Sequence, residues 1–426
     1  MKIKNFKQLA KNDLRENILN IAEAGLKSID IGTVISDSVS LNEENLFIKD
    51  KVFSLENKRL HIVGIGKSGF KSAKTLKRIL GEKIYSGLVI DIEKGDLGNI
   101  KTYEATHPFP SNKNKEASKD LVSFLKKMDE DDFVIFVISG GGSTMLTLPD
   151  GISVKEEEKI IKELFKSGAT IQEINTIRKH ISFCRGGFLL QYVYPAKSVS
   201  LILSDVPGDD FQFISSGPTI KDNTTIEGAK AIISKYSILE KTGVENIKLI
   251  ETPKDDRYFN SSDNLLILSN QKALDIMSLV AKRLGFSVFI KTNTLKGEAR
   301  EIGIQIAQEL KKHPPKTVLL YAGETTVTIK GNGLGGRNQE LVLGAFPYII
   351  EKEIIMSFAS DGYDNSDHAG ALCDYLTKEK AEEININFNK YLQNNDSYIF
   401  FEITGDYLET GNTGSNVSDL IIAAKA

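Results

Sequence analysis

Short apolar runs alternate with longer amphipathic stretches along most of the chain. In the first half, apolar runs bounded by polar residues predict strands at 59–65, 87–92, 132–138 and 198–203. The amphipathic stretches around them predict helices at 11–28, 68–80, 115–128, 155–167, 171–192 and 225–234. Since this order is typical of βαβ units, it predicts an α/β fold with a mainly parallel sheet.

A second alternating series follows a polar stretch at 243–262, which contains Pro253 and lacks clear periodicity. In that series we expect strands at 265–268, 287–291, 317–321, 354–360 and 420–424. Helices are expected at 271–284, 298–312 and 339–350. The polar stretch is a candidate domain boundary, so we expect two α/β domains, 1–245 and 255–426, with a cleft between them.

Composition narrows the class of protein. The chain has 426 residues, a hydrophobic content of 41% and a formal net charge of −3, which suits a globular protein and gives no basic surface for nucleic acid or anionic membrane. The basic N-terminus lacks the apolar segment of a secretory signal, and the longest apolar run, Phe133–Ile138, is too short to cross a bilayer. With only two cysteines, a disulfide scaffold is not expected, and a cytoplasmic location fits best.

A glycine-rich segment, Gly64-Ile65-Gly66-Lys67-Ser68-Gly69, follows one predicted strand and opens a predicted helix. It matches GxGxxG, the dinucleotide-binding pattern, and Asp91 at the end of the next strand is placed to bind a ribose. Lys67 instead favours phosphoryl transfer, because a lysine within an anion-binding loop neutralises phosphate charge. A tight strand-to-helix turn that binds nothing is the third interpretation.

Two further polar segments of the first half suit binding of an anion. Ser139-Gly140-Gly141-Gly142-Ser143 follows the most apolar strand, where successive backbone N–H groups can hold a carboxylate or phosphate. Within the predicted helix 171–192, the stretch 175–180 contains consecutive basic side chains, among them Arg178. A solvent-exposed helix face explains this basic run equally well.

Acidic and glycine-rich loops follow other strands. Asp205, Asp209 and Asp210 come after the strand at 198–203, where carboxylates suit Mg²⁺ ligation, a general base or the geometry of a tight turn. In the second half, Ala322-Gly323-Glu324 follows a strand, and Gly333–Gly336 leads into a helix that starts near Arg337. Arginine in that position can bind a phosphate or carboxylate through two hydrogen bonds.

Several long motifs resemble the glycerate 2-kinase family, whose C-terminal part is the MOFRL domain. They are SGGGSTMLTLP, SGATIQEINTIRKHIS, LILSDVPGDD, ISSGPT, AGETTVTIKGNGLGGRNQE and TGNTGSNVSDL, and they extend in order from about Gly64 to Asp419. The resemblance implies transfer of the ATP γ-phosphoryl group to the 2-hydroxyl of D-glycerate, with Mg²⁺. It also implies a Rossmann-like N-terminal domain, a smaller C-terminal MOFRL domain and an active site in the interdomain cleft. The run at 360–367 departs from the usual TDGxDGPTD-like form, although its acids keep their positions.

The resemblance also assigns expected roles to residues. The catalytic residues would be Lys67, Arg337 and an acid of the SDVPGDD stretch, Asp205 or Asp209, of which we favour Asp205. The expected substrate-binding residues are Ser139, Gly140, Gly141, Gly142, Ser143 and Arg178. The expected nucleotide-binding residues are Gly64, Gly66, Ser68, Gly323, Glu324, Gly335 and Gly336. Asp205 and Asp209 are the expected ligands of Mg²⁺.

Two alternatives to a kinase remain open at this point. The GxGxxG segment and Asp91 suit an NAD(P)-dependent hydroxypyruvate reductase, a label also given to members of this family. A non-catalytic module that binds an acid or a sugar phosphate would use SGGGS alone. For the kinase we expect a monomer or homodimer with D-glycerate as its partner, and neither nucleic acid nor membrane.

Overall fold

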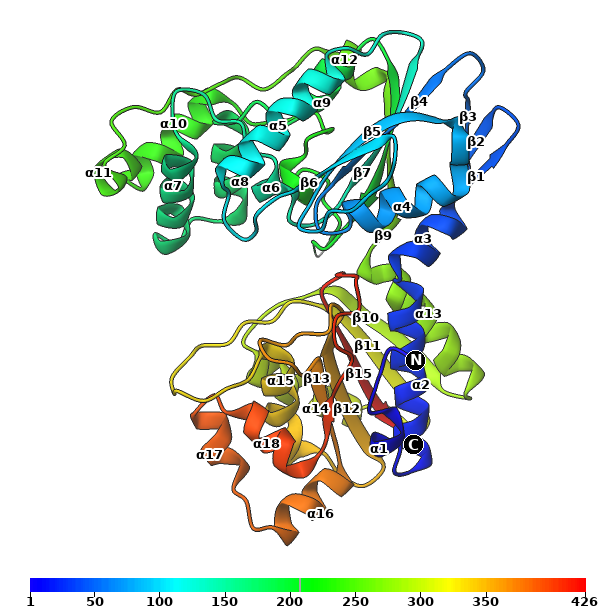
Figure 1. Cartoon of the computed structure of the whole chain (residues 1–426). Coiled ribbons are helices and arrows are strands. Elements are labelled where there is room, and N and C mark those ends of the chain that lie inside the picture. Colours follow the sequence, from blue (N-terminus) through cyan, green and yellow to red (C-terminus); the bar gives the residue numbers. More distant parts are fainter. Residues whose placement is uncertain (207) are drawn as a thin grey trace. The chain divides into compact units, whose positions relative to one another are not determined.

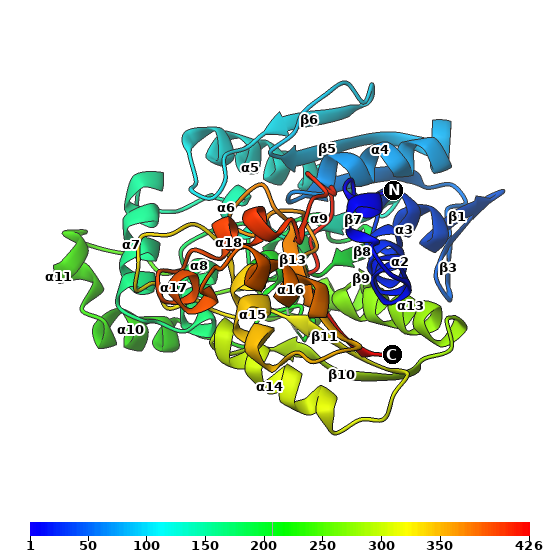
Figure 2. The same cartoon turned by 90° about the horizontal axis from the view of Figure 1, so that it is seen from below.

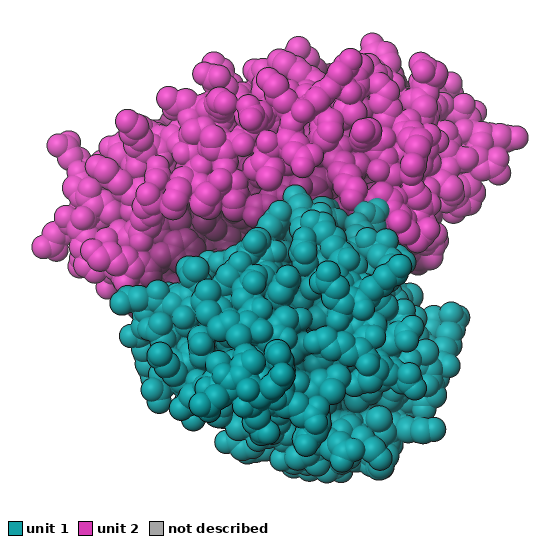
Figure 3. Space-filling model, turned by 60° about the horizontal axis from the view of Figure 1, so that its bottom comes forward, with its two compact units in different colours: residues 1–30, 268–426 teal, residues 31–267 magenta. Residues whose placement is uncertain are grey.

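The computed structural model describes residues 1–206 and 208–426 (Figure 1, Figure 2). The described residues form two compact units, coloured separately in Figure 3. Unit 1 comprises residues 1–30 and 268–426, and unit 2 comprises residues 31–267. The linear division 1–245 and 255–426 stays a prediction, whereas packing groups the first 30 residues with the C-terminal part of the chain.

Unit 2 contains a six-stranded sheet and a smaller three-stranded sheet, β1–β3, which precedes it along the chain. Its strands are β1 Val39–Asn42, β2 Asn45–Ile48, β3 Lys51–Ser54, β4 Arg59–Ile65, β5 Ile84–Asp91, β6 Ile100–Glu104, β7 Asp132–Ile138, β8 Lys197–Leu203 and β9 Ser262–Leu268. Its α-helices are α3 Ile31–Ser38, α4 Gly69–Leu80, α5 Asn112–Leu125, α6 Gly142–Met145, α7 Val154–Lys166, α8 Ile171–His180, α9 Phe188–Val193, α10 Ile226–Lys235, α11 Ile238–Thr242 and α12 Asp256–Asn260. Short 3₁₀ turns are Gly81–Lys83 and Ile214–Ser216.

The large sheet has the order β6-β5-β4-β7-β8-β9, and the pairs from β6 to β8 are parallel. This confirms the mainly parallel sheet expected from the sequence. Ile65 at the end of β4 pairs with Ile138 at the end of β7, which in turn pairs with Ile202 of β8. The loops that follow these three strands therefore leave the same edge of the sheet, where open α/β sheets bind ligands.

Apolar side chains cover both faces of this sheet. Alternate residues of β4, β5 and β7 pack with α5 and α9, and the opposite face packs with α4. Helices α7, α8, α10 and α11 form a second apolar cluster, located in Figure 1 at the end of unit 2 opposite β1–β3. The cavity described below is lined in part by this helical cluster.

Two local expectations for unit 2 are corrected. The expected helix 171–192 is interrupted, because α8 ends at His180 and α9 begins at Phe188. Gly186 and Gly187 directly precede α9 with φ of 59° and 88°, a left-handed conformation that a continuous α-helix does not contain. The antiparallel strands β1–β3 had no counterpart among the expected elements, since each has only four residues.

Unit 1 contains a mixed sheet with the order β10-β11-β15-β12-β13-β14. Its strands are β10 Ser287–Leu295, β11 Thr317–Gly323, β12 Glu353–Ala359, β13 Gly370–Asp374, β14 Tyr407–Leu408 and β15 Asp419–Lys425. Its α-helices are α1 Phe6–Leu9, α2 Asp13–Ser28, α13 Asn270–Arg283, α14 Ala299–Lys311, α15 Arg337–Ala345, α16 Tyr375–Glu383, α17 Phe388–Gln393 and α18 Ser397–Thr404, and a 3₁₀ turn spans Phe346–Tyr348. The β10–β11 pair is parallel and the other printed pairs are antiparallel, so this sheet differs from that of unit 2.

Helices cover both faces of the unit 1 sheet. Helices α2 and α13 lie side by side on one face, and α14 and α15 pack against the other (Figure 1, Figure 2). Arg15 of α2 is fully buried, and its guanidinium pairs with Asp374 and Asp406 at 2.5 and 2.6 Å. These ion pairs tie the N-terminal segment to unit 1.

No helix in the described part of the chain is both long and apolar enough to cross a membrane.

Candidate active site

The glycine-rich turn after β4 is a close packing of backbone segments. Gly64 and Gly69 face each other, and a Cβ at Gly64 would lie 2.9 Å from the Gly69 carbonyl oxygen. The backbone N–H groups of the turn are engaged: Gly66 donates to Ile90, Lys67 to Gly140, and Gly69 to Gly66. Ser68 N–H donates to the Ser139 hydroxyl at 3.1 Å. The Lys67 side chain, not the backbone, is thus the group that this turn offers to an anion.

Asp91 is engaged in the same turn. Its buried carboxylate accepts hydrogen bonds from the N–H groups of Phe70, Ile92 and Glu93. Burial raises the pKa of Asp91 to about 6, although these hydrogen bonds oppose the rise. Because the carboxylate stabilises the start of α4, this geometry gives the hydroxypyruvate reductase interpretation less support than the sequence did.

The second glycine loop, Ser139–Ser143, follows β7 at the same edge of the sheet. Gly141 has a left-handed φ of 85°. Among the described residues, no acceptor takes a hydrogen bond from the N–H groups of Gly140, Gly141, Gly142 or Ser143. Ser139 has a structural role, since its hydroxyl donates a hydrogen bond to the Ile65 carbonyl oxygen at 3.1 Å. The loop therefore keeps a row of N–H donors for an external anion.

Glycine is required in this loop because polar side chains pack directly against its backbone. A Cβ at Gly140 would overlap the Asp205 carboxylate, and a Cβ at Gly142 would overlap the Ser215 hydroxyl. A Cβ at Gly141 would lie 3.1 Å from the Lys67 side chain and 3.3 Å from the His107 imidazole. The two residues Lys67 and Asp205, distant in sequence, thus flank neighbouring glycines.

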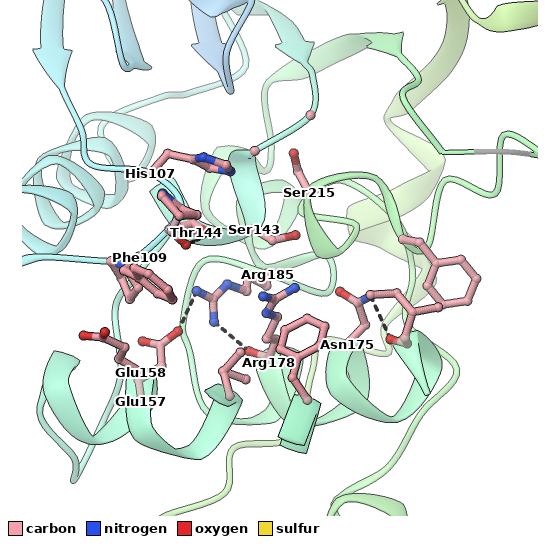
Figure 4. A pocket seen from close by; sticks show the side chains of 18 of the residues that line it. His107, Phe109, Ser143, Thr144, Glu157, Glu158, Asn175, Arg178, Arg185 and Ser215 are labelled. Carbon is pink, nitrogen blue, oxygen red and sulfur yellow. Dashed lines mark hydrogen bonds and ion pairs between the residues drawn. The ribbon is translucent and has the colours of Figure 1, made fainter. Parts of the chain in front are cut away.

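A cavity of about 410 Å³ opens beside this loop and lies within unit 2 (Figure 4). Gly140, Gly141, Ser143, Arg178 and Asp205 all line it, so the structure brings these expected site residues together. Other polar groups and several apolar side chains complete the wall, namely His107, Thr144, Glu157, Glu158, Lys162, Asn175, Arg185, Ser215, Phe109, Ile161, Phe165, Ile171, Val206 and Phe213. The combination of apolar walls and a few convergent polar groups is typical of a small-molecule site.

Two arginines, Arg178 and Arg185, line the cavity. Arg185 is 1% exposed and is held by Glu157 at 2.7 Å, by the Thr147 hydroxyl and by the Arg178 carbonyl oxygen. Arg178 forms no ion pair with any carboxylate in the described part of the chain, and its guanidinium lies over the Phe165 ring. Burial and the charge of Arg185 lower the pKa of Arg178 to about 10. Arg178 remains charged at neutral pH and has room for an external carboxylate.

His107 lies in the same cavity, although the sequence analysis did not select it. Burial, then the charges of Lys67 and Arg178, lower its pKa to about 4. Arg185 and Glu157 were likewise not among the expected site residues. The local feature at His107 is the proline-rich segment 107–110, which follows β6, a strand absent from the expected elements. Its approach to Gly141 depends on tertiary packing.

The acidic segment after β8 fits a magnesium ion bound chiefly through nucleotide phosphates. Asp205 lines the cavity, and the buried Oδ1 of Asp209 has no hydrogen-bond partner among the described residues. Mg²⁺ commonly takes one or two carboxylates and completes its shell with water and phosphate oxygens. Within residues 1–206 and 208–426, no group of three or more His, Cys, Asp and Glu side chains forms a metal site.

Of the expected site residues of unit 1, Gly335, Gly336 and Arg337 line a cavity of about 590 Å³, whereas Gly323 and Glu324 are not part of its lining. Arg337 at the start of α15 pairs with Asp419 at 2.5 Å and with Glu324 at 3.2 Å. Burial alone would lower the pKa of Arg337, but these carboxylates raise it above its usual range. Burial raises the pKa of Asp419 to about 7, although Arg337 opposes the rise.

Glycines of the unit 1 site are needed for close backbone approach. Gly336 caps α15, and a Cβ there would overlap Asp364, whose carboxylate accepts hydrogen bonds from the N–H groups of Asn338 and Gln339. Gly323 ends β11 with a φ of 148°, beside Leu295 of β10. Asp364 therefore occupies the N-terminal donors of α15, and Arg337 is the cationic group at this helix end.

Taken by itself, unit 2 is an open-sheet α/β domain with a cavity, lined by cationic and polar groups, at the carboxyl edge of its strands. Residues 17–251 match the family model described as a domain of unknown function, DUF4147, and residues 317–419 match the MOFRL family.

Relatives of known name cover nearly the whole chain. A D-glycerate 2-kinase of Thermotoga maritima is 38% identical over 91% of this chain and 96% of its own length. A glycerate 2-kinase of Pyrococcus horikoshii is 36% identical over 96% of this chain and 97% of its own length. The crystal structure of a glycerate kinase from Thermotoga maritima superposes with a TM-score of 0.84 at 33% identity, and the match covers 96% of this chain and 99% of that one. The chain belongs to the glycerate 2-kinase family.

Proposed function

We propose that this protein is an ATP-dependent D-glycerate 2-kinase, which transfers the γ-phosphoryl group to the 2-hydroxyl and releases 2-phospho-D-glycerate and ADP. The observation that carries the proposal is the set of anion-binding groups in the unit 2 cavity. Arg178 has no carboxylate partner in the described part of the chain. The same cavity is lined by Asp205 and by Gly140, Gly141 and Ser143, whose N–H groups donate to no acceptor among the described residues. Family membership adds the reaction class.

In the proposed complex, the carboxylate of D-glycerate binds Arg178 and the N–H groups of Gly140–Ser143. Arg185 positions Arg178, since its guanidinium donates to the Arg178 carbonyl oxygen at 3.2 Å while Glu157 holds it in place. Asp205, packed against Gly140, orients the 2-hydroxyl and accepts its proton as the O–P bond forms. Gly140 would thus contact both the bound carboxylate, through its N–H group, and the proposed base Asp205.

The phosphoryl group requires cations, because negative charge spreads over its oxygens in the transition state. We assign this role to Lys67 of unit 2 and Arg337 of unit 1. Mg²⁺ would be held by Asp205 and Asp209 and would neutralise the β- and γ-phosphates of ATP. The other proposed nucleotide contacts are Gly64, Gly66, Ser68, Gly323, Glu324, Gly335 and Gly336. In the turn at 66–68 the backbone N–H groups already donate within the protein, so contacts there would use side chains and carbonyl oxygens.

Phosphate transfer from ATP to D-glycerate in the presence of Mg²⁺ tests the proposal. Enolase distinguishes the products, because it consumes 2-phosphoglycerate directly and 3-phosphoglycerate not at all. We expect ADP release coupled to enolase turnover. A 3-phospho product would retain the kinase but overturn the role of Asp205 at the 2-hydroxyl, and NADH-dependent loss of hydroxypyruvate without phosphate transfer would overturn the kinase.

We further propose that the enzyme works in the cytoplasm as a monomer or homodimer. Its two cysteines, Cys184 and Cys373, are buried and unpaired, as suits a reducing compartment. Sedimentation analysis of the purified protein tests the oligomeric state, and a larger assembly would contradict it.

A further inference from the structure

Among the uncharged polar side chains of the described cavity wall, His107 is distinguished by its lack of a hydrogen-bond partner. It lies between β6 and α5, and its imidazole is drawn in Figure 4 above Ser143 and Thr144. Neither ring nitrogen forms a hydrogen bond within residues 1–206 and 208–426. The ring lies beside Gly141, which Lys67 also contacts.

The other uncharged polar side chains of this cavity wall already have partners. The Ser143 hydroxyl is bonded to Ser216 at 2.9 Å, and the Ser215 hydroxyl donates to the Ser139 carbonyl at 2.6 Å. Thr144 donates to the Pro108 carbonyl at 3.3 Å. The Asn175 amide donates to the Ile171 carbonyl and accepts from Ser216.

The charge state of His107 restricts what it can bind. With a pKa of about 4, the ring is neutral at physiological pH, because the cations Lys67 and Arg178 add to the effect of burial. A neutral imidazole offers one N–H donor and one acceptor nitrogen. Such a group suits a hydroxyl, which donates and accepts, better than a carboxylate, which only accepts.

D-Glycerate carries three polar groups, and the proposed function accounts for two of them. Arg178 and the loop N–H groups take the carboxylate, and Asp205 takes the reacting 2-hydroxyl. The 3-hydroxyl remains, and leaving it unpaired in a closed site would cost affinity. His107 is the uncharged polar group of the described cavity wall that is left to receive it.

We infer that His107 binds the 3-hydroxyl of the acceptor and thereby makes the site selective for a 2,3-dihydroxy acid over a 2-hydroxy acid without that group. The inference rests on the proposed function and extends it to a specificity-determining residue. No proton transfer is assigned to His107.

The test compares D-glycerate with D-lactate, which keeps the carboxylate and the 2-hydroxyl but lacks the 3-hydroxyl. The KM and kcat for D-glycerate and the inhibition constant of D-lactate against it are measured for wild type, His107→Ala and His107→Gln. In His107→Ala we expect kcat/KM for D-glycerate to fall about 10- to 100-fold, while the D-lactate inhibition constant changes less than about twofold, within the range of a neutral substitution. His107→Gln, which keeps a donor and an acceptor, should recover part of the loss.

Phe109→Leu is the matched control, because Phe109 follows His107 in the same segment and lines the same cavity without a polar group. It should leave the discrimination between the two acids unchanged. Equal losses for both acids in His107→Ala, or no loss for D-glycerate, would overturn the inference while wild-type transfer still supports the kinase. If the wild-type protein transfers no phosphate to D-glycerate, the proposed function falls first and the inference with it.

Discussion

Arg178 in unit 2 and Arg337 in unit 1 are both proposed to bind anions, but they differ in whether a carboxylate of the described chain already pairs with them. Arg178 is largely buried without a carboxylate partner in the described chain, and its pKa is lowered to about 10. Arg337 is already paired with Asp419 and Glu324, and its pKa is raised. The difference indicates that Arg178 is ready for a permanent anion such as a carboxylate. Arg337 must exchange or share its carboxylates, which suits charge that appears only during transfer.

Separate replacement of these arginines should give the largest effects and different kinetic signatures. Arg337→Ala should lower kcat about 10³-fold with little change in KM for D-glycerate, since it removes charge stabilisation in the transition state. Arg178→Ala should mainly raise the KM for D-glycerate, about 10²-fold, because it removes a charged hydrogen-bonding group of the ground state. Steady-state kinetics with both substrates measure the two effects.

The exposed Arg257, which pairs with its neighbour Asp255, provides the control in unit 2. Arg257→Ala should leave both constants unchanged. If Arg337→Ala lowers thermal stability but not kcat, its role is to neutralise the buried Asp419 rather than to assist transfer. The proposal that Arg337 binds the transferring phosphoryl group would then be wrong.

In unit 1, the buried Arg15 pairs the N-terminal segment with two carboxylates of the C-terminal part of the chain, and its removal should lower stability. Arg15→Met would leave the buried Asp374 without its cation, and the buried Asp406 would keep only the ion pair with Lys11 at 3.4 Å. Breaking a buried pair in this way costs about 3–5 kcal/mol. We expect a lower unfolding midpoint by circular dichroism, which suits a chain without tryptophan.

Lys4→Met is the matched control, because Lys4 lies in the same segment and pairs with Glu409 at 3.5 Å on the surface. Its effect should stay below about 1 kcal/mol. Equal destabilisation by both variants would mean that the N-terminal segment is held by its apolar contacts and not by the Arg15 ion pairs.

A smaller effect is expected from the glycine loop of unit 2. In Gly140→Ala the added methyl group would overlap Asp205, so the carboxylate must move. Misplacing a catalytic group by about 1 Å can cost 10²-fold, and we expect a loss of that order in kcat/KM. Gly228→Ala in α10 is the control, because its Cβ would meet only Thr225 at 3.7 Å. Activity within twofold of wild type in both variants would show that the Gly140–Asp205 contact is dispensable.

Features that a short stretch of sequence determines could be predicted, whereas features that depend on distant parts of the chain could not. Strands β4 and β7 were predicted with their observed bounds, because a strand buried on both faces reads as an uninterrupted apolar run. The SGGGS loop and Asp205 could be found because both follow such strands. The antiparallel pairing in unit 1 and the packing of residues 1–30 with it could not be predicted. Arg15 meets Asp374 across 359 residues, and no local pattern encodes that approach.

The site residues that were missed illustrate the same limit. His107 and Arg185 are ordinary polar residues in sequence, and their significance comes from neighbours that are distant along the chain, Gly141 and Glu157. Conversely, GxGxxG has a clear sequence signature, yet the backbone of that turn is engaged with β5 and the loop after β7. A motif therefore indicates where the chain turns, and the hydrogen bonds of its N–H groups indicate whether a ligand can use the turn.

The smallest predicted effect concerns the electrostatic link between Lys67 and His107. Since burial, Lys67 and Arg178 together lower the pKa of His107 to about 4, Lys67→Met should raise it toward its ordinary value of 6.5. Nuclear magnetic resonance titration of the ring protons can follow this shift, because the chain has only five histidines. As the folded pKa is below the unfolded one, His107 favours folding above pH 6.5, and this contribution is lost as the pH falls from 6.5 to about 4. The Lys67→Met protein should therefore lose less stability over that interval.

Lys162→Met separates a specific link from a general change in charge. Lys162 lines the same cavity, but it pairs with Glu158 at 2.6 Å and lies over the Phe109 ring. Its charge is not among the causes that lower the pKa of His107, so that pKa should stay unchanged in Lys162→Met. An equal rise in both variants would mean that His107 senses the overall charge of the cavity. An unchanged pKa in Lys67→Met would remove Lys67 from the neighbourhood of Gly141, and with it the argument that the lysine and the acceptor share one site.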